Sequence, residues 1–332
     1  MLREQMLTLL PAGIRWDDVK RHPTWIRRGS YFLDQVGFDP AGEDANIRLN
    51  TWAGWPTKPR AGSCKLALDL LRYLCSGEPN ADEIHSWVIK WLAYPIQHPG
   101  AKMKSALVVH GPQGTGKSMI FEAIGELYGE YYILLNQGAI EDKFNADWSA
   151  RKLYVVADEI VARQDMHHVK NQLKTLVTGQ WVRVNPKNLI AYRERNHMNF
   201  VFLSNEHQPI VIEHDDRRHG VIWTPPKLPK ERYDDVAAEL ENGGLEALHQ
   251  YLLDIDLAGF GPHTEPPMTR SKRDLLDLSR GSVDRFVHQW QQLEIPDSEG
   301  NGVLPFCPCL GSHLYAMYRK WCERVGERDM GD

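Results

Sequence analysis

The sequence lacks the features of a membrane or exported protein. No apolar run among its 332 residues is long enough to cross a bilayer, and segment 1–11 does not follow the basic, apolar, small-residue order of an export signal. Cysteine is scarce: the five cysteines are odd in number and contain no CxxC pair, which favours reduced thiols. We therefore expect a cytoplasmic protein with no membrane partner.

The sequence also lacks two further features: cysteine and histidine spacing typical of a zinc site, and an excess of positive charge. Cys307, Cys309, His313 and Cys322 fit none of the common zinc patterns, so the sequence disfavours a zinc site. The formal net charge is −5, so the chain as a whole is not attracted to nucleic acid. Contact with a polyanion would therefore need a local basic surface, such as a channel.

A glycine-rich turn stands between an apolar run, 106–110, and a helical apolar stripe. It matches the GxxxxGK[ST] pattern, in which glycines let backbone N–H groups and a helix N-terminus face an anion. Lys117 would reach the β- and γ-phosphates and Ser118 would bind Mg²⁺, so ATP with Mg²⁺ is expected; the alternative is an accidental glycine turn. The predicted nucleotide-binding residues are Gly111, Pro112, Gln113, Gly114, Thr115, Gly116, Lys117, Ser118 and Met119.

Polar residues follow two later apolar runs. Asp158 and Glu159 end the run 153–159, where one carboxylate can hold Mg²⁺ and the other can deprotonate the attacking water. Asn205 ends the run 199–205 and would place an amide near the γ-phosphate. The alternatives are a solvated acidic pair and an ordinary turn asparagine. We interpret Asp158, Glu159 and Asn205, together with Lys117, as catalytic.

Paired arginines precede another β-prone run. Arg217 and Arg218 could spread positive charge over the γ-phosphate, and if supplied by a neighbouring subunit they would link hydrolysis to assembly. They could instead pair locally with Asp215, Asp216 or Glu213.

Two β-prone runs flank Asn185-Pro-Lys-Asn188 and predict a hairpin over 181–192. Lys187 at its tip could contact a phosphodiester backbone, although lysines at turns are usually only solvated.

The order of these segments predicts an α/β fold, with a sheet covered by helices on both faces between 105 and 225. We divide the chain into four parts: an irregular N-terminal segment, 1–62; a helical module, 63–100; an ATPase domain, 101–228; and a helical C-terminal region, 229–332. Helices are predicted over 65–75, from 80 or 82 to Pro95, and over 165–178. Two C-terminal apolar faces are predicted: Val283, Phe286, Val287, Trp290 and Leu293, and Leu314, Tyr315, Tyr318, Trp321, Cys322 and Val325.

Together, these motifs resemble a superfamily-3 helicase of the AAA+ class, the helicase part of phage and plasmid primase-helicase proteins. The resemblance covers about 106–223, and its most discriminating piece is 173–187, which is similar to that superfamily's helix, glycine turn and DNA-gripping hairpin. It implies DNA contacts at Lys174, Lys187 and Asn188, and an arginine finger at Arg217 or Arg218. Gln180 departs from the acidic residue of many relatives and is assigned no role.

The resemblance also implies an AAA+ P-loop core with an inserted β-hairpin and small helical modules on either side. It implies a homo-oligomer of six subunits with ATP between neighbours, moving on single-stranded DNA at a replication fork, usually 3′ to 5′, in a bacterial host cell. A primase or polymerase domain would be linked to the chain. The helix at 314–325 resembles the start of a winged helix that ends before completion.

Two other functions remain open from sequence. A nucleotide-switched DNA-binding or initiator module would share the phosphate loop, the acidic strand and the arginines, and would lack processive unwinding. A small-molecule kinase would be a monomer whose hydrolysis single-stranded DNA does not stimulate, and the hairpin and paired arginines argue against it.

Overall fold

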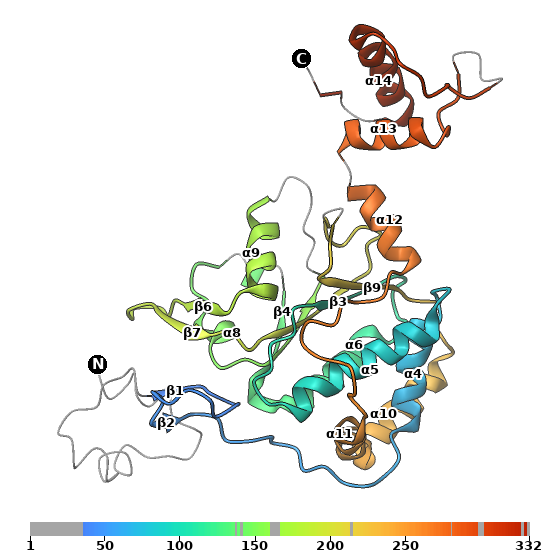
Figure 1. Ribbon diagram of the computed structural model, residues 1–332. Coiled ribbons are helices and arrows are strands. Elements are labelled where there is room, and N and C mark those ends of the chain that lie inside the picture. Colours follow the sequence, from blue (N-terminus) through green and yellow to red (C-terminus); the bar gives the residue numbers. More distant parts are fainter. Residues whose placement is uncertain are drawn as a thin grey trace. The chain divides into compact units, whose positions relative to one another are not determined.

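The computed structural model describes residues 36–136, 138–139, 142–159, 167–212, 215–279, 281–297, 302–326 and 329–330 (Figure 1). These residues form two compact units. The first contains the described residues up to 210 together with 217–272, and the second contains 211–216 and the described residues from 273 onward. None of the helices described is both long and apolar enough to span a membrane.

A five-stranded parallel sheet forms the centre of the first unit, in the order β4-β5-β8-β3-β9. All residues of β3 and β8 are buried, as expected for a parallel sheet with both faces covered. The expected α/β core is therefore present. The strands are β3 (Ala106–His110), β4 (Tyr132–Leu135), β5 (Tyr154–Asp158), β8 (Asn199–Ser204) and β9 (His219–Trp223).

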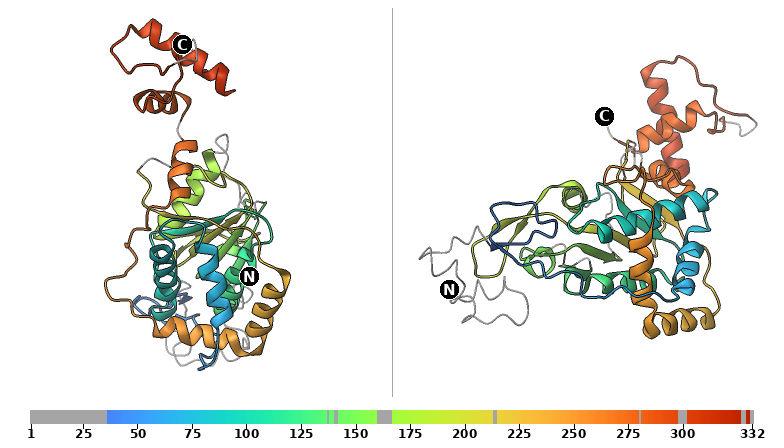
Figure 2. Two further views of the ribbon diagram at one scale, coloured as in Figure 1. Left: turned by 90° about the vertical axis from the view of Figure 1, so that its right-hand side faces the viewer. Right: turned by 60° about the horizontal axis from the view of Figure 1, so that its bottom comes forward.

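Helices pack one face of this sheet into a large apolar core. Buried side chains from four of them meet alternate residues of the strands, such as Val109, Val156 and Val201. The four are α4 (Lys65–Cys75), α5 (Ala81–Gln97), α6 (Lys117–Tyr128) and α11 (Leu245–Asp254). Figures 1 and 2 show α4, α10 (Lys230–Glu239) and α11 at one side of this unit, with α9 (His167–Thr178) at the other.

The predicted helix ending at Pro95 is longer than expected. Helix α5 continues to Gln97, and the His98 N–H donates to the Tyr94 carbonyl at 2.9 Å. Proline removes one hydrogen bond and crowds the preceding turn, yet Pro95 and Ile96 are buried in the core, so packing carries the helix slightly further. The predicted start of α9 at 165 lies outside the described residues.

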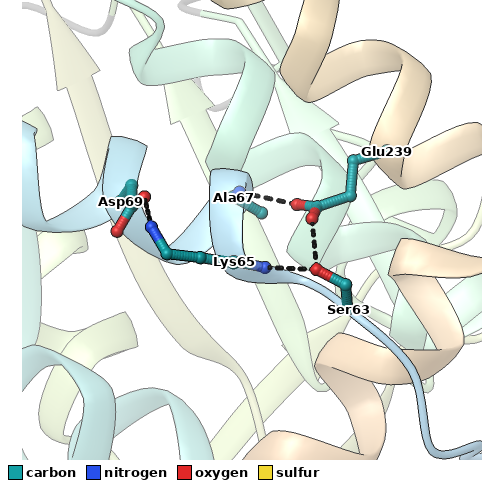
Figure 3. Close-up of polar contacts among 5 residues, drawn as sticks. All are labelled: Ser63, Lys65, Ala67, Asp69 and Glu239. Atoms are coloured by element: carbon teal, nitrogen blue, oxygen red, sulfur yellow. Dashed lines mark hydrogen bonds and ion pairs between the residues drawn. The ribbon is translucent and has the colours of Figure 1, made fainter.

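Helix α10 belongs with the sheet, although sequence placed it in a C-terminal region beginning at 229. The Glu239 carboxylate accepts hydrogen bonds from the Ser63 hydroxyl at 2.8 Å and the Ala67 N–H at 3.0 Å, as Figure 3 shows. These contacts fasten the end of α10 to the start of α4. The predicted division at 228/229 therefore differs from the division into compact units, because it rested only on a proline-rich stretch.

The part of the N-terminal segment that is described also packs on the sheet unit. It contains two short parallel strands, β1 (Val36–Gly37) and β2 (Leu49–Asn50). Trp52 lies 4.5 Å from Tyr131 between ring centroids, and Trp55 lies 5.1 Å from Tyr128. Aromatic contacts of this kind hold an otherwise irregular segment in place.

The second unit has a small core between α13 (Ser282–Gln291) and α14 (Gly311–Val325), and α12 (Arg270–Ser279) leads into it. The core consists of Phe286, Trp290, Ile295, Tyr318, Trp321 and Cys322. The central residues of both predicted apolar faces are buried, as expected, but each prediction extended the face too far. Val283, Leu293 and Val325 are exposed, because they lie toward the ends of the two stripes.

Candidate functional site

The glycine-rich loop connects the carboxyl end of β3 with the first turn of α6. Gly111, Gly114 and Gly116 have φ angles of 139°, 76° and 89°, which favour glycine. A Cβ on Gly111 would lie 2.5 Å from the Thr224 hydroxyl oxygen, and one on Gly116 would lie 2.9 Å from the Tyr233 ring. A Cβ on Gly114 would meet nothing within 4 Å. The loop is therefore packed at both ends and open in the middle.

Lys117 is held inside this loop. Its ammonium donates to the Gly111 carbonyl at 2.9 Å, the Pro112 carbonyl at 2.8 Å and the Asn205 side-chain oxygen at 3.1 Å. Burial lowers the pKa of Lys117, and the nearby Asp158 carboxylate opposes that shift. No side chain in the described structure caps the N-terminus of α6. A cation and the N–H groups of a helix's first turn are thus gathered at one place, an arrangement suited to an anion.

The acidic pair and Asn205 come from the two neighbouring strands. Strand β8 lies between β3 and β5, with His110 opposite Ser204 and Asp158 opposite Leu203. Since the three strands are parallel, their carboxyl ends meet at one edge of the sheet.

A chain of hydrogen bonds joins these residues. The Asn205 amide donates to the Glu159 carboxylate at 3.2 Å and accepts from Lys117. Glu159 has a left-handed φ of 53°, and its N–H donates to the Leu203 carbonyl. Burial raises the pKa of Asp158, the charge of Glu159 raises it further, and Lys117 opposes the rise. The structure thus gathers Lys117, Asn205, Asp158 and Glu159 in one site.

The other residues of the predicted phosphate site differ in what they can contribute. Ser118 is half-buried and follows Lys117 in the first turn of α6, and hydroxyl and carboxylate oxygens such as those of Ser118 and Asp158 are donor types that bind Mg²⁺. Thr115 is buried, with its hydroxyl 3.3 Å from that of Thr224, and Met119 packs against the core. The buried Thr115 can therefore face a ligand only through its backbone, and Met119 is half-buried. Gln113 and Gly114 are exposed.

Thr224 and Tyr233 were not identified from sequence as neighbours of the loop. They lie more than a hundred positions further along the chain, in a proline-rich stretch and on α10. A threonine and a tyrosine in such places carry no local signal, and only the packing of β9 and α10 brings them to the glycines.

Arg217 and Arg218 lie at the opposite edge of the sheet from Lys117. The Arg218 carbonyl accepts from the Ala106 N–H at 2.7 Å, and Ala106 begins β3 whereas the phosphate loop follows its end. A five-residue strand at about 3.3 Å per residue places roughly 13–17 Å between these edges. Arg217 is exposed, with a guanidinium nitrogen 3.8 Å from the Glu265 carboxylate. The structure does not bring these arginines into the chain's own site.

A hairpin is present where one is predicted over 181–192, but its second strand begins only at Tyr192, so 189–191 belong to the loop. Strands β6 (Trp181–Val184) and β7 (Tyr192–Arg195) pair antiparallel, and the loop between them carries Lys187 and Asn188, both exposed. Asn188 has a left-handed φ of 62°. Lys174 lies on α9, is half-buried and is not part of this loop.

Other contacts fix the base of the hairpin loop. The Asn185 N–H donates to the Asn145 side-chain oxygen at 2.7 Å, and the Asn185 amide donates to the Lys143 carbonyl at 2.8 Å. The loop bearing Lys187 therefore projects from an anchored base.

The cysteines considered as zinc ligands lie in the second unit. Cys322 is buried in the small core, whereas Cys307 and Cys309 are exposed. In the described part of the chain, no three His, Cys, Asp or Glu side chains come close enough to share a metal ion.

Comparison with known proteins identifies relatives of this region. Residues 109–218 match a family of unknown function, DUF5906. Over 137 residues the chain is 33% identical to the DNA primase-polymerase of Nitratiruptor phage NrS-1, which corresponds to 40% of this chain and 19% of the phage protein. The chain is homologous to part of that protein. It spans about a fifth of the relative's length.

Solved structures of the NrS-1 C-terminal region have a similar fold. An apo structure of its residues 305–718 matches with a TM-score of 0.65 at 24% identity, over 76% of this chain and 62% of that one. The A form apo structure also matches with a TM-score of 0.65, at 22% identity, over 85% of this chain and 70% of that one. At these identities the structural matches establish the fold.

Proposed function

We propose that this chain is an ATP-driven DNA helicase or translocase of phage replication. The observation that supports this most directly is the position of the hairpin in the chain. Helix α9 and the β6–β7 hairpin are inserted between β5 and β8, the two strands that deliver Glu159 and Asn205 to the Lys117 site. A change in the relation of Glu159 to Asn205 during ATP hydrolysis would therefore act on both ends of the insert.

The site residues have complementary roles in cleavage of the terminal phosphate. Lys117 and the N-terminus of α6 stabilise the negative charge of the β- and γ-phosphates. Glu159 orients and deprotonates the attacking water, and Asn205 holds the Glu159 carboxylate in place through its 3.2 Å hydrogen bond. Ser118 and Asp158 would hold Mg²⁺, which when bound neutralises charge on the phosphates.

Hydrogen bonds between α9 and its neighbours would transmit movement to the hairpin. Lys102 donates to the Leu176 carbonyl at 3.0 Å, and Asn196 donates to the same carbonyl at 2.8 Å. Lys104 donates to the Thr178 carbonyl at 3.3 Å. These donors satisfy the carbonyl end of α9 and join it to the residues that precede β3 and follow β7. The insert is thus tied to the sheet and would move with it.

The position of Arg217 and Arg218 supports ATP binding between subunits of a ring, which we infer to contain six copies. An arginine at the far edge of the sheet cannot serve its own Lys117 site, but it can reach the site of a neighbour. Mixing the Arg217→Ala/Arg218→Ala double variant with the Lys117→Ala variant is expected to restore part of the ATP hydrolysis, because a mixed interface combines an intact loop with an intact finger.

The measurement is steady-state phosphate release over a range of mixing ratios. Each variant alone provides the baseline, and Arg60→Ala/Arg232→Ala, two exposed arginines elsewhere, is the matched control. If no ratio exceeds the sum of the two baselines, the arginines do not act across subunits.

Homology to a phage primase-polymerase supports a role in DNA replication, with a primase or polymerase domain as a linked partner. The DNA substrate would be the single strand at a replication fork, with Lys187, Asn188 and Lys174 in contact with it. We propose 3′-to-5′ movement, which follows from the resemblance to superfamily-3 helicases.

The Lys187→Ala variant tests the motor assignment. It is expected to bind ATP as the unchanged protein does, and to lose about tenfold or more in unwinding of a fork with a 3′ overhang, because the loop would no longer hold the strand. Strand displacement is measured by release of a labelled oligonucleotide, with Lys58→Ala, another exposed lysine, as the control. Undiminished unwinding by Lys187→Ala would refute the assignment. DNA binding without strand displacement by the unchanged protein would instead indicate an initiator module.

A further inference from the structure

The two faces of the β6–β7 hairpin differ sharply in composition. In its antiparallel register Trp181 lies opposite Arg195 and Arg183 lies opposite Arg193, so these four residues share one face. All four are exposed. The other face carries Val182, Val184, Tyr192 and Glu194, of which both valines are buried. The hairpin thus packs its apolar face on the protein and presents a face of three arginines and a tryptophan.

Within the described part of the chain, no carboxylate forms an ion pair with Arg183, Arg193 or Arg195. Arg183 and Arg193 are directly opposite each other, and like charges in that position destabilise a strand pair. The chain has a net charge of −5, so this cluster is a locally positive surface on a negatively charged protein. A bound anion would reduce the repulsion between its arginines.

Trp181 adds an aromatic surface to this charge. Its side chain is 48% exposed, and the Arg193 guanidinium lies 5.7 Å from the ring centroid. Water contact with so large an apolar ring is unfavourable, and an aromatic ring next to arginines is the combination on which unpaired bases stack.

A cavity of about 1160 Å³ adjoins strand β7, and side chains from both faces of that strand line it, Tyr192 and Glu194 as well as Arg193 and Arg195. Trp181, Arg193 and Arg195 line it on the hairpin side, and Arg48 and Arg151 line it from two other segments. None of its lining residues belongs to the phosphate loop, so it is separate from the ATP site. Its volume is sufficient for a nucleotide unit turned out of a strand.

Five carboxylates line this cavity, those of Asp39, Asp44, Glu130, Asp147 and Glu194, and three of them accept hydrogen bonds from backbone N–H groups. Asp39 accepts from the Asp44 N–H at 2.8 Å, Asp44 accepts from the Asn46 N–H at 3.0 Å, and Glu194 accepts from the Arg151 N–H at 2.7 Å. Burial raises the pKa of Glu194 to about 7. The raised pKa of Glu194 lowers the negative charge in the cavity near neutral pH, and five basic side chains, those of Arg48, Arg151, Lys152, Arg193 and Arg195, line it beside the other carboxylates.

We propose that the Trp181, Arg183, Arg193 and Arg195 face of the hairpin, with the adjoining cavity, binds single-stranded DNA. The guanidinium groups bind phosphate oxygens, and Trp181 stacks on a base. This inference rests on the proposed action on DNA and adds a second contact, apart from Lys187 at the loop. Paired DNA fits the face less well, because its bases are not free to stack on Trp181.

Binding of a labelled thymidine oligonucleotide to the full chain, measured by fluorescence anisotropy at several salt concentrations, tests the proposal. The Arg193→Gln/Arg195→Gln variant is expected to bind about tenfold or more weakly, and the slope of log K against log salt is expected to fall by about 1.4, which corresponds to two lost phosphate contacts. Arg193→Lys/Arg195→Lys should restore most of the slope. Trp181→Ala is expected to weaken binding about tenfold with an unchanged slope.

Arg60→Gln/Arg232→Gln is the matched charge control, and far-ultraviolet circular dichroism verifies folding of each variant. Wild-type affinity and slope in the Gln variant, with weaker binding by Lys187→Ala, would overturn this inference and leave the proposed function standing. Absence of DNA binding by the unchanged protein would remove both. If the Gln variant kept its DNA binding but lost self-association, as measured by sedimentation, the face would bind a second copy of the chain and the proposal would be overturned.

Discussion

Replacing Lys117 with alanine is expected to reduce ATP hydrolysis by at least about 100-fold and to weaken ATP binding. The physical reason is the position of its ammonium, which is largely buried and within hydrogen-bonding distance of two loop carbonyls and Asn205. Alanine removes the only lysine of the loop, and the remaining N–H groups would have to bind the phosphates without it.

Phosphate release and binding of a fluorescent ATP analogue measure these two effects. Lys65→Ala is the matched control, since Lys65 also lies at the start of a helix and is exposed, and its ammonium forms an ion pair with Asp69, as Figure 3 shows. The control should hydrolyse ATP at the unchanged rate. Equal rates for Lys117→Ala and Lys65→Ala would show that the glycine loop does not act on ATP.

The Glu159→Gln variant is expected to bind ATP normally and to hydrolyse it about 100-fold to 10,000-fold more slowly. Glutamine keeps an oxygen that can accept from Asn205, so the hydrogen-bond chain to Lys117 is preserved. It cannot accept a proton from the attacking water. Binding and turnover should therefore separate in this variant, whereas Lys117→Ala impairs both.

Single-turnover hydrolysis with bound ATP distinguishes these outcomes. Glu126→Gln on α6 is the matched control, because Glu126 is exposed and has no hydrogen bond to the loop or to Asn205 in the described structure. Wild-type turnover by the Glu159→Gln variant would show that another group is the base. Asp158→Asn would then be the next substitution to examine.

Local patterns predicted several elements around the candidate site, because each pattern reflects a physical requirement that acts over a few residues. Only glycine adopts the φ angles of Gly111, Gly114 and Gly116 without strain, and a buried parallel strand needs a continuous apolar run. The first strand of the hairpin was predictable for a similar reason, since a β-prone run precedes the Pro-Lys-Asn turn, whereas the second strand begins three residues later than its predicted run. The limits of the apolar stripes were less predictable, because burial at the ends of a helix depends on its neighbours, as the exposed Val325 shows.

No short sequence pattern indicated the contacts between segments that are far apart in the chain. The strand order places β8 between β3 and β5, and this order brings Asn205 between Lys117 and Glu159. The same sheet separates Arg217 and Arg218 from that site. The arginine face of the hairpin also depended on register, because a shift of one residue would distribute Trp181 and the arginines differently between the two faces.

The sequence by itself determined that a glycine-rich loop, an acidic strand end, a polar strand end and a hairpin follow one another in an α/β chain. Glycine conformation, apolar run length and turn chemistry act over a few residues, so they can be identified without coordinates. Tertiary structure alone decided which of these pieces meet. Pairing of parallel strands and packing of α4 and α10 against the loop join residues far apart in the chain, and no short segment encodes that choice.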